Sequence, residues 1–145
     1  MPAKSPDLER RKLAIEATRD HFVGKPFEWG RVDCAKVAAY HLRKMGKRPS
    51  FAKAGSYNTA LGAKRALARS GYASLKDALT QMGLLEIPPA AALPGDIMIH
   101  DAQLDGFEAM QIIVGNAAVF SFYEDRLDEG LLVVRLARLG RVFRV

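Results

Sequence analysis

Apolar residues at helical spacing predict four helices in the first half of the chain. Leu8, Ile15 and Phe22 recur every seven residues and would share one face of the first helix. Pro6 suits the first turn of that helix, and Gly24 ends it. The other three predicted helices, each followed by a glycine, are Asp33–Met45, Asn58–Ser70 and Ser74–Met82.

After Pro88 and Pro89 the pattern changes to short runs rich in β-branched and aromatic residues, which predict strands. Gly115 and Asn116 stand between two of these runs at hairpin spacing. Helices first and closely spaced strands second indicate an α+β fold with an antiparallel sheet. A length of 145 residues suits a single domain, 1–145. The predicted strands are Asp96–His100, Met110–Val114, Ala117–Phe122, Leu131–Leu136 and Val142–Val145.

Charge and hydropathy limit the kinds of molecule that the protein is expected to bind. The chain carries 22 Lys and Arg against 16 Asp and Glu, a net charge of +6. No run of five or more basic residues occurs, so we expect a solvated surface and no nucleic-acid partner. Lys64, Arg65 and Arg69 share one predicted helix and could meet an acidic partner, although a solvated helix face is the alternative. The N-terminus lacks the apolar stretch of a signal peptide, and no window suits a membrane span.

Metals and cofactors have little support in the sequence. One cysteine excludes an internal disulfide and a Cys-rich zinc site, and no histidine pair has the H-E-x-x-H spacing. No phosphate-binding glycine motif and no βαβ alternation occurs. We therefore expect no cofactor and no metal. The most acidic stretch is predicted to be a turn and comprises Glu124, Asp125, Asp128 and Glu129.

Cys34 is the first candidate for chemistry. If Asp33 caps a helix, Cys34 is the first residue of that helix, where unpaired N–H groups and the helix dipole favour a thiolate. A thiolate is the form in which cysteine acts as a nucleophile. The alternative is a small buried apolar residue, a common fate of a lone cysteine.

The segment FEWGRVDCAKVAAYHL, residues 27–42, resembles the nucleophile motif of the NlpC-type papain-like cysteine peptidases. The resemblance resumes at the Pro94-Gly95-Asp96 turn and continues more weakly at Met110–Gly115. It covers residues 27–145 and leaves residues 1–26 as an N-terminal helical extension. It implies a papain-like fold in which the helix bearing Cys34 packs on an antiparallel sheet.

Family members cut peptide cross-links in bacterial cell walls, and the length and order of motifs resemble a small subgroup encoded among phage tail genes. The resemblance therefore implies a virion protein of the tail tip, with other tail-tip proteins or peptidoglycan stem peptides as partners. Trp29 and Asp33 would then contact the substrate. The alternatives are core packing for Trp29 and helix capping for Asp33.

The base histidine of the family is missing, because counting back from Gly115 places Ala109 at its position. Antiparallel pairing would put His100 opposite Ala109, so we advance His100 as a replacement base for Cys34. His41 lies seven residues beyond Cys34 on the same predicted helix, which is too far from the thiol for a direct hydrogen bond. Two functions remain open. One is a degenerate tail component with a structural role, and the other is an active cysteine hydrolase with Cys34 and His100 as catalytic residues.

Overall fold

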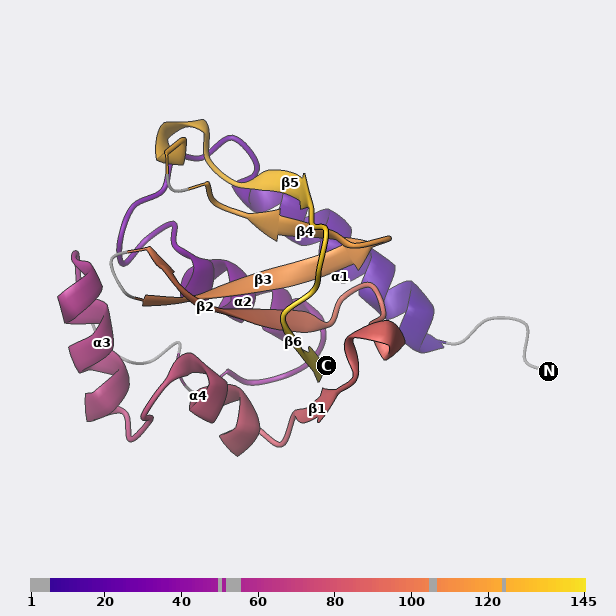
Figure 1. The fold of residues 1–145 in the computed structure, drawn as a ribbon, viewed down its shortest axis with the longest axis horizontal. Helices are drawn as coiled ribbons and strands as arrows, with labels where there is room; N and C mark the ends of the chain where they lie inside the picture. The colour runs from indigo at the N-terminus through magenta and orange to yellow at the C-terminus, as the bar shows by residue number, and fades with distance from the viewer. Residues whose placement is uncertain (1–5, 50, 52–55, 105–106, 124) are drawn as a thin grey trace.

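The computed structural model describes residues 6–49, 51, 56–104, 107–123 and 125–145 of the chain. Within them, helices lead and an antiparallel sheet follows, so the predicted α+β class is confirmed (Figure 1). Each helix begins and ends within two residues of its predicted bounds. The helices are α1 (Pro6–Phe22), α2 (Cys34–Lys44), α3 (Ala60–Arg69) and α4 (Leu75–Gln81).

In the described part of the chain, six strands form one sheet in the order β1-β6-β2-β3-β4-β5, and every neighbouring pair is antiparallel. The last strand in the sequence, β6, therefore lies between β1 and β2 (Figure 1). His100 faces Ala109 across β2 and β3, which confirms the predicted register. The strands are β1 (Leu85–Ile87), β2 (Ile97–Leu104), β3 (Phe107–Gly115), β4 (Ala118–Ser121), β5 (Leu132–Arg135) and β6 (Arg141–Arg144).

Several details of the sheet differ from the prediction, and among them β2 continues to Leu104 and β3 begins at Phe107, beyond the predicted Asp96–His100 and Met110–Val114. The short strand β1 was not expected, because three residues beside prolines give too little pattern to detect. The turn between β3 and β4 consists of Asn116 and Ala117, one residue later than predicted. Both residues have positive φ, 49° and 62°, as the type I′ hairpin turn requires.

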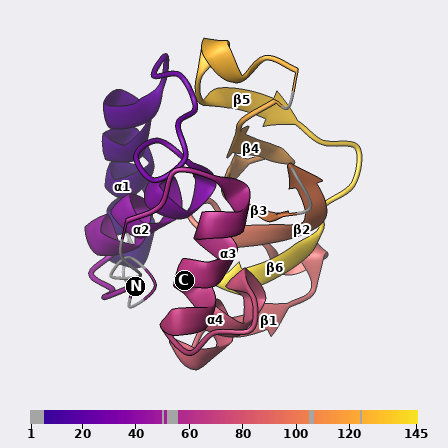
Figure 2. The ribbon, with the colours of Figure 1, turned by 90° about the vertical axis from the view of Figure 1, so that its left-hand side faces the viewer.

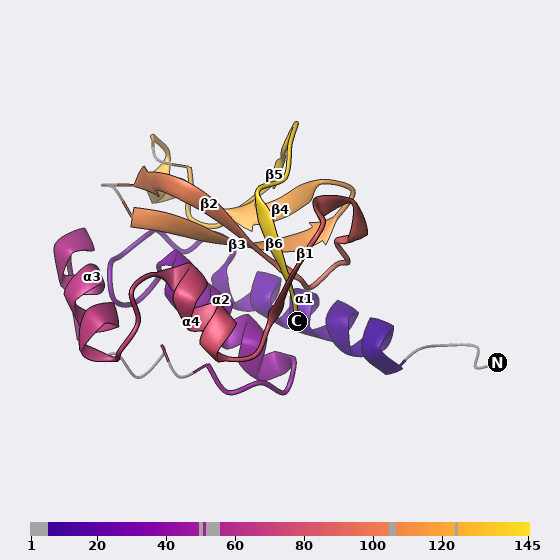
Figure 3. The same ribbon diagram turned by 60° about the horizontal axis from the view of Figure 1, so that its bottom comes forward.

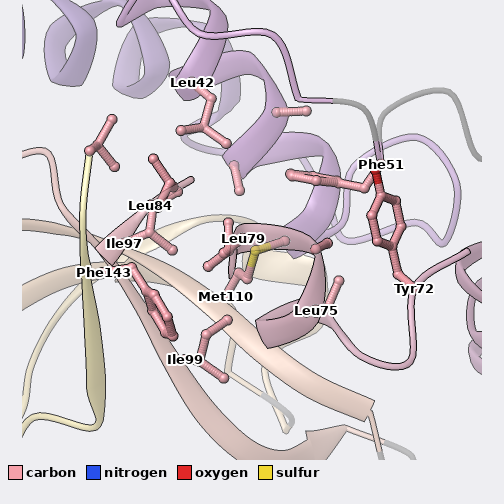
Figure 4. Close-up of a cluster of buried hydrophobic side chains, with 14 of the residues drawn as sticks. Leu42, Phe51, Tyr72, Leu75, Leu79, Leu84, Ile97, Ile99, Met110 and Phe143 are labelled. Carbon is pink, nitrogen blue, oxygen red and sulfur yellow. The ribbon is translucent and has the colours of Figure 1, made fainter. Parts of the chain in front are cut away.

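All four helices lie on one side of the sheet (Figures 2 and 3). We call the side of the sheet that they cover the helix face and the opposite side the far face. Residues alternate between the two faces along a strand. Ile97 and Ile99 join the cluster on the helix face, whereas Met98 joins a second cluster on the far face. The helix-face core includes Leu42, Phe51, Tyr72, Leu75, Leu79, Leu84, Met110 and Phe143 (Figure 4).

Helix α1 buries a face that only partly overlaps the predicted one. Of the heptad, Phe22 is buried and Ile15 packs against the same core cluster, whereas Leu8 is 54% exposed. The buried stripe is rotated about the helix axis relative to the stripe of Leu8, Ile15 and Phe22, and two of its residues are polar. Its members are Arg11, Ala14, Thr18 and Phe22.

The buried Arg11 is held by an ion pair with Asp96, at the start of the sheet. Their side chains are 2% and 0% exposed, and Arg11 Nη1 lies 2.9 Å from Asp96 Oδ1. The same guanidinium donates to the carbonyl oxygens of Pro94 and Val145. Asp96 also accepts hydrogen bonds from the Leu93 and Val145 N–H groups and from the Arg144 side chain. A buried charge pair is tolerated where its remaining atoms are hydrogen-bonded in this way.

The turn before Asp96 packs closely against the Arg11 side chain of this ion pair. Gly95 has φ +93°, and a Cβ there would lie 3.2 Å from the Arg11 side chain, so glycine suits both the turn and the close approach. The Gly95 carbonyl accepts a hydrogen bond of 2.8 Å from His41 Nε2. His41, on α2, is fully buried. The turn therefore links α1, α2 and β2.

We expect Arg11→Met to lower the free energy of unfolding by about 3–5 kcal/mol, because the buried Asp96 carboxylate loses its buried guanidinium partner and keeps only the part-exposed Arg144. Arg10→Met is the matched control on the same helix. Arg10 is 46% exposed and pairs with Asp7 at the surface, so its loss should be below about 1 kcal/mol. Urea denaturation followed by circular dichroism measures both. Equal losses would contradict a special role for the buried pair.

Burial lowers the pKa of His41 below its ordinary value of 6.5. The unfolded chain therefore takes up a proton near pH 6.5 that the folded protein does not, and stability falls as the pH drops from 7 toward the lowered folded pKa. His41→Gln should lose less free energy of unfolding than the wild type between about pH 7.5 and pH 5.5. His21→Gln leaves His41 in place and should retain the wild-type loss. The hypothesis fails if the two variants lose equal amounts.

Candidate functional site

Asp33 fixes the start of the helix that carries Cys34. Its Oδ1 accepts a hydrogen bond of 2.9 Å from the Lys36 N–H, which confirms the predicted N-cap. Its Oδ2 accepts from the Gly30 N–H and from the Tyr57 hydroxyl, each at 2.8 Å. The Asp33 side chain is only 1% exposed. These bonds engage both carboxylate oxygens and give Asp33 a structural role, and its predicted substrate contact stays a prediction.

Gly30 closes this loop against Tyr57. A Cβ on Gly30 would lie 1.9 Å from the Tyr57 carbonyl oxygen, and Gly30 has φ +85°, so only glycine fits. Tyr57 escaped the sequence analysis, because it stands outside the motif and reaches Asp33 only through the fold. Packing thus explains the glycine of the Trp29-Gly30 pair, and this explanation does not depend on catalysis.

The Cys34 thiol lies against the edge of β3. Its Sγ is 3.9 Å from the Glu108 carbonyl oxygen, and the Met110 N–H also points to it. On the same strand, Ile113 exchanges hydrogen bonds with Gly95 and Asp96, which lie at the start of β2. Backbone groups of successive residues point to opposite edges of a strand. The backbone groups that contact Cys34 therefore point away from β2.

The edge of β3 beside Cys34 is open to the thiol because β4 is short. Strand β4 pairs with β3 only between Ile112 and Gly115. The helix α2 brings Cys34 to the part of the edge that β4 leaves unpaired. The thiol thus takes its neighbours from the backbone of one strand.

Burial raises the pKa of the Cys34 thiol from 9.0 to about 12, and the adjacent Asp33 charge acts in the same direction. The N–H groups of Met110, Ala35 and Cys34 itself favour the thiolate but are outweighed. The surroundings of Cys34 therefore oppose the thiolate that the sequence predicts at the helix start. Near neutral pH the sulfur carries its proton.

A pocket of about 370 Å³ opens beside Cys34. Its aromatic wall includes Trp29 and Phe27, whose rings meet edge to face at 4.9 Å, and Phe122, which meets Phe27 at 5.1 Å. Trp29 also packs against the helix-face core. The substrate contact predicted for Trp29 stays a prediction.

His100 lines the same pocket as Cys34 but from the far face of the sheet. It follows Met98 by two residues on β2, and Met98 belongs to the far-face cluster. Its ring lies over Gly140, where a Cβ would be 3.3 Å from His100 Nδ1. Cys34 instead packs with the helix-face core. The two residues therefore share a pocket while β3 runs between them.

Gln111 is a pocket residue that the sequence analysis missed. Its side chain is 7% exposed, and its Nε2 donates a hydrogen bond of 2.7 Å to Ser121 Oγ. Ser121 is the last residue of the neighbouring strand β4. Among the described residues, Gln111 Oε1 has no hydrogen-bond partner. The available signal was a glutamine inside an otherwise apolar run, Met110–Val114.

Two further classes of site were sought in the described part of the chain. It contains no group of three or more His, Cys, Asp or Glu placed to hold a metal ion. In the predicted acidic turn, residues Leu127–Glu129 form a short 3₁₀ helix, and Glu124 lies outside the described residues. None of the described helices is long and apolar enough to cross a membrane.

The raised pKa of Cys34 predicts that its thiol reacts slowly with electrophiles. Iodoacetamide should label Cys34 on the order of 1,000-fold more slowly than free cysteine near pH 8, because the thiolate fraction falls tenfold per pKa unit. Asp33→Asn keeps a good N-cap residue and removes the charge, so labelling should become several-fold faster. Glu28→Gln, which removes an exposed acid from the same loop, is the control. Labelling of the wild type at the rate of free cysteine would contradict the protonated thiol.

Comparison with known proteins adds the family but no activity. The family model described as Domain of unknown function (DUF6950) matches residues 6–145. Neither the curated proteins nor the solved structures give a match. The matched region includes α1, which the NlpC resemblance leaves out. With almost the whole chain matched, the protein belongs to the DUF6950 family.

Proposed function

We propose that this protein is a degenerate member of the papain-like NlpC fold that acts structurally, as a component of a phage tail tip. The observation that carries the loss of catalysis is the surroundings of Cys34. Its Sγ lies 3.9 Å from the Glu108 carbonyl oxygen, burial raises the pKa of the thiol, and the family's base position is Ala109. A general base typically contributes about 10²–10⁴-fold to a reaction.

The assignment to the NlpC fold is supported by the order and contacts of the elements. A helix that begins with Asp33-Cys34 packs on an antiparallel sheet, and the Pro94-Gly95-Asp96 turn opens one of its central strands. Both motifs also have a structural role, because Asp33 caps α2 and Asp96 forms the buried ion pair with Arg11 on α1. Retention of these residues therefore does not require retention of an activity.

The tail-tip role rests on the sequence resemblance, and particle composition tests it. The protein should co-purify with tail particles in a fixed ratio, and deletion of its gene should stop assembly or remove the tip. Particles carrying Cys34→Ala should assemble and infect as the wild type does, because the thiol has no chemical role. Arg11→Met is the comparison variant, in which the fold is weakened while Cys34 is intact. A protein that is absent from purified particles would rule out the tail component.

An active cysteine hydrolase is the second candidate, favoured by the fact that Cys34 and His100 line one pocket. In such an enzyme His100 would accept the thiol proton, and the aromatic wall with Trp29 would hold a peptidoglycan stem peptide. This requires the imidazole to reach the thiol past β3, within about 2.6–3.2 Å or through one water.

Peptidoglycan digestion separates the two functions. We expect purified protein to release no wall peptides above the level of Cys34→Ala, as measured by chromatography of the soluble products. His100→Ala provides a second variant, since a hydrolase that uses this base should lose activity in both. Release that depends on Cys34 would overturn the structural proposal, and release that also depends on His100 would establish the replacement base.

A further inference from the structure

The positive charge is concentrated in the middle of the chain. Residues 34–76 contain ten of the 22 Lys and Arg and none of the 16 Asp and Glu. The remaining 12 basic residues share the rest of the chain with all 16 acids. Basic and acidic residues are therefore not interspersed within residues 34–76, which we call the acid-free segment.

The basic side chains of the acid-free segment differ in their ion pairing from other arginines of the described structure. No ion pair between described residues includes any of them, whereas arginines elsewhere, such as Arg11, Arg141 and Arg144, are paired. Nine of the ten lie within the described residues. They are Lys36, Arg43, Lys44, Lys47, Arg48, Lys64, Arg65, Arg69 and Lys76.

Helix α3 carries the densest exposed group of these charges. Lys64, Arg65 and Arg69 are all exposed, while Ala63, Ala66 and Leu67 are buried on the other side of the helix. Arg65 and Arg69 are four residues apart, and like charges at this spacing destabilise a helix by about 0.2–0.5 kcal/mol. Lys64 and Arg65 stand before the last turn, so they gain little from the helix dipole.

The exposed face of α3 also carries an apolar side chain. Leu61 is 56% exposed and lies one helical turn before Lys64 and Arg65. Exposed Ala68 continues this face, which we call the α3 face: Leu61, Lys64, Arg65, Ala68 and Arg69. The helix stands at the margin of the molecule, beside the end of the β2–β3 pair (Figures 1 and 2). Its outer side is thus open to a partner.

We propose that the α3 face is a docking surface for an acidic protein partner, whose carboxylates pair with Lys64, Arg65 and Arg69 and whose apolar side chain covers Leu61. Carboxylates complement the three charges and remove their mutual repulsion. Leu61 favours a protein over a nucleic acid, because protein interfaces combine an apolar centre with a polar rim. A phosphate backbone offers no apolar group to such a side chain. The proposal rests on charge and exposure and does not depend on the tail-tip function.

The probe is a fluorescein-labelled acidic peptide with Leu at every third or fourth position and Glu elsewhere. Fluorescence anisotropy at low salt should detect its binding to the full chain, and binding should weaken as salt rises. The triple variant Lys64→Glu, Arg65→Glu, Arg69→Glu should weaken binding at least about tenfold, since attraction becomes repulsion. The control triple is Lys12→Glu, Lys25→Glu, Arg138→Glu, three exposed residues elsewhere with the same change in net charge. It should change binding by less than about twofold.

Leu61→Ser separates a protein partner from a general polyanion. It should weaken peptide binding by about threefold or more, with no effect on a 20-base-pair DNA duplex measured in the same way. Circular dichroism confirms that each variant is folded. No peptide binding, equal losses in the two triples, or duplex binding as tight as peptide binding would overturn the proposal. Self-association in sedimentation that the α3 triple abolishes would also overturn it, because the occupant would then be a second copy.

Discussion

The buried ion pair between Arg11 and Asp96 holds together segments that are far apart in the sequence. It joins α1 to the start of β2, and Asp96 also binds the end of the chain through Arg144 and Val145. Removing two charges from water costs several kcal/mol per ion, so the pair persists only because its other atoms are hydrogen-bonded. Through the carbonyl of Gly95 the same turn binds His41 on α2. The position of the helix that carries Cys34 thus depends on this network.

At Cys34 two physical effects compete, and their sizes decide the outcome. A helix N-terminus stabilises a negative charge by about 0.3–1 kcal/mol, which is less than the 1.36 kcal/mol of one pKa unit. Burial, aided by Asp33, raises the pKa by about three units, from 9.0 to about 12. The residue that caps the helix therefore also opposes the thiolate. A cysteine at a helix start is a nucleophile only where solvent access or a cationic partner adds to the dipole.

Local signals predicted much of the fold. Asp33 and the closing glycines placed the helices, runs of β-branched and aromatic residues placed most strands, and antiparallel pairing placed His100 opposite Ala109. The buried side of α1 was missed, because Arg11 looks like a surface residue until Asp96, 85 positions later, is brought against it. The place of β6 between β1 and β2 is likewise set by tertiary contacts. The relation of Cys34 to His100 depended on which edge of β3 the helix reaches, and no local pattern reports that.

Charge shows the same contrast between whole-chain and local properties. A net charge of +6 is moderate for 145 residues, and on its own it favours a solvated surface. Electrostatic interactions between exposed groups fade over about 8 Å at physiological ionic strength, so a surface responds to its neighbours and not to the total. Around the sheet, arginines such as Arg141 and Arg144 have acids within reach. The acid-free segment has none of its own, and none of its described basic side chains is in an ion pair, so no ion pair offsets their positive charge.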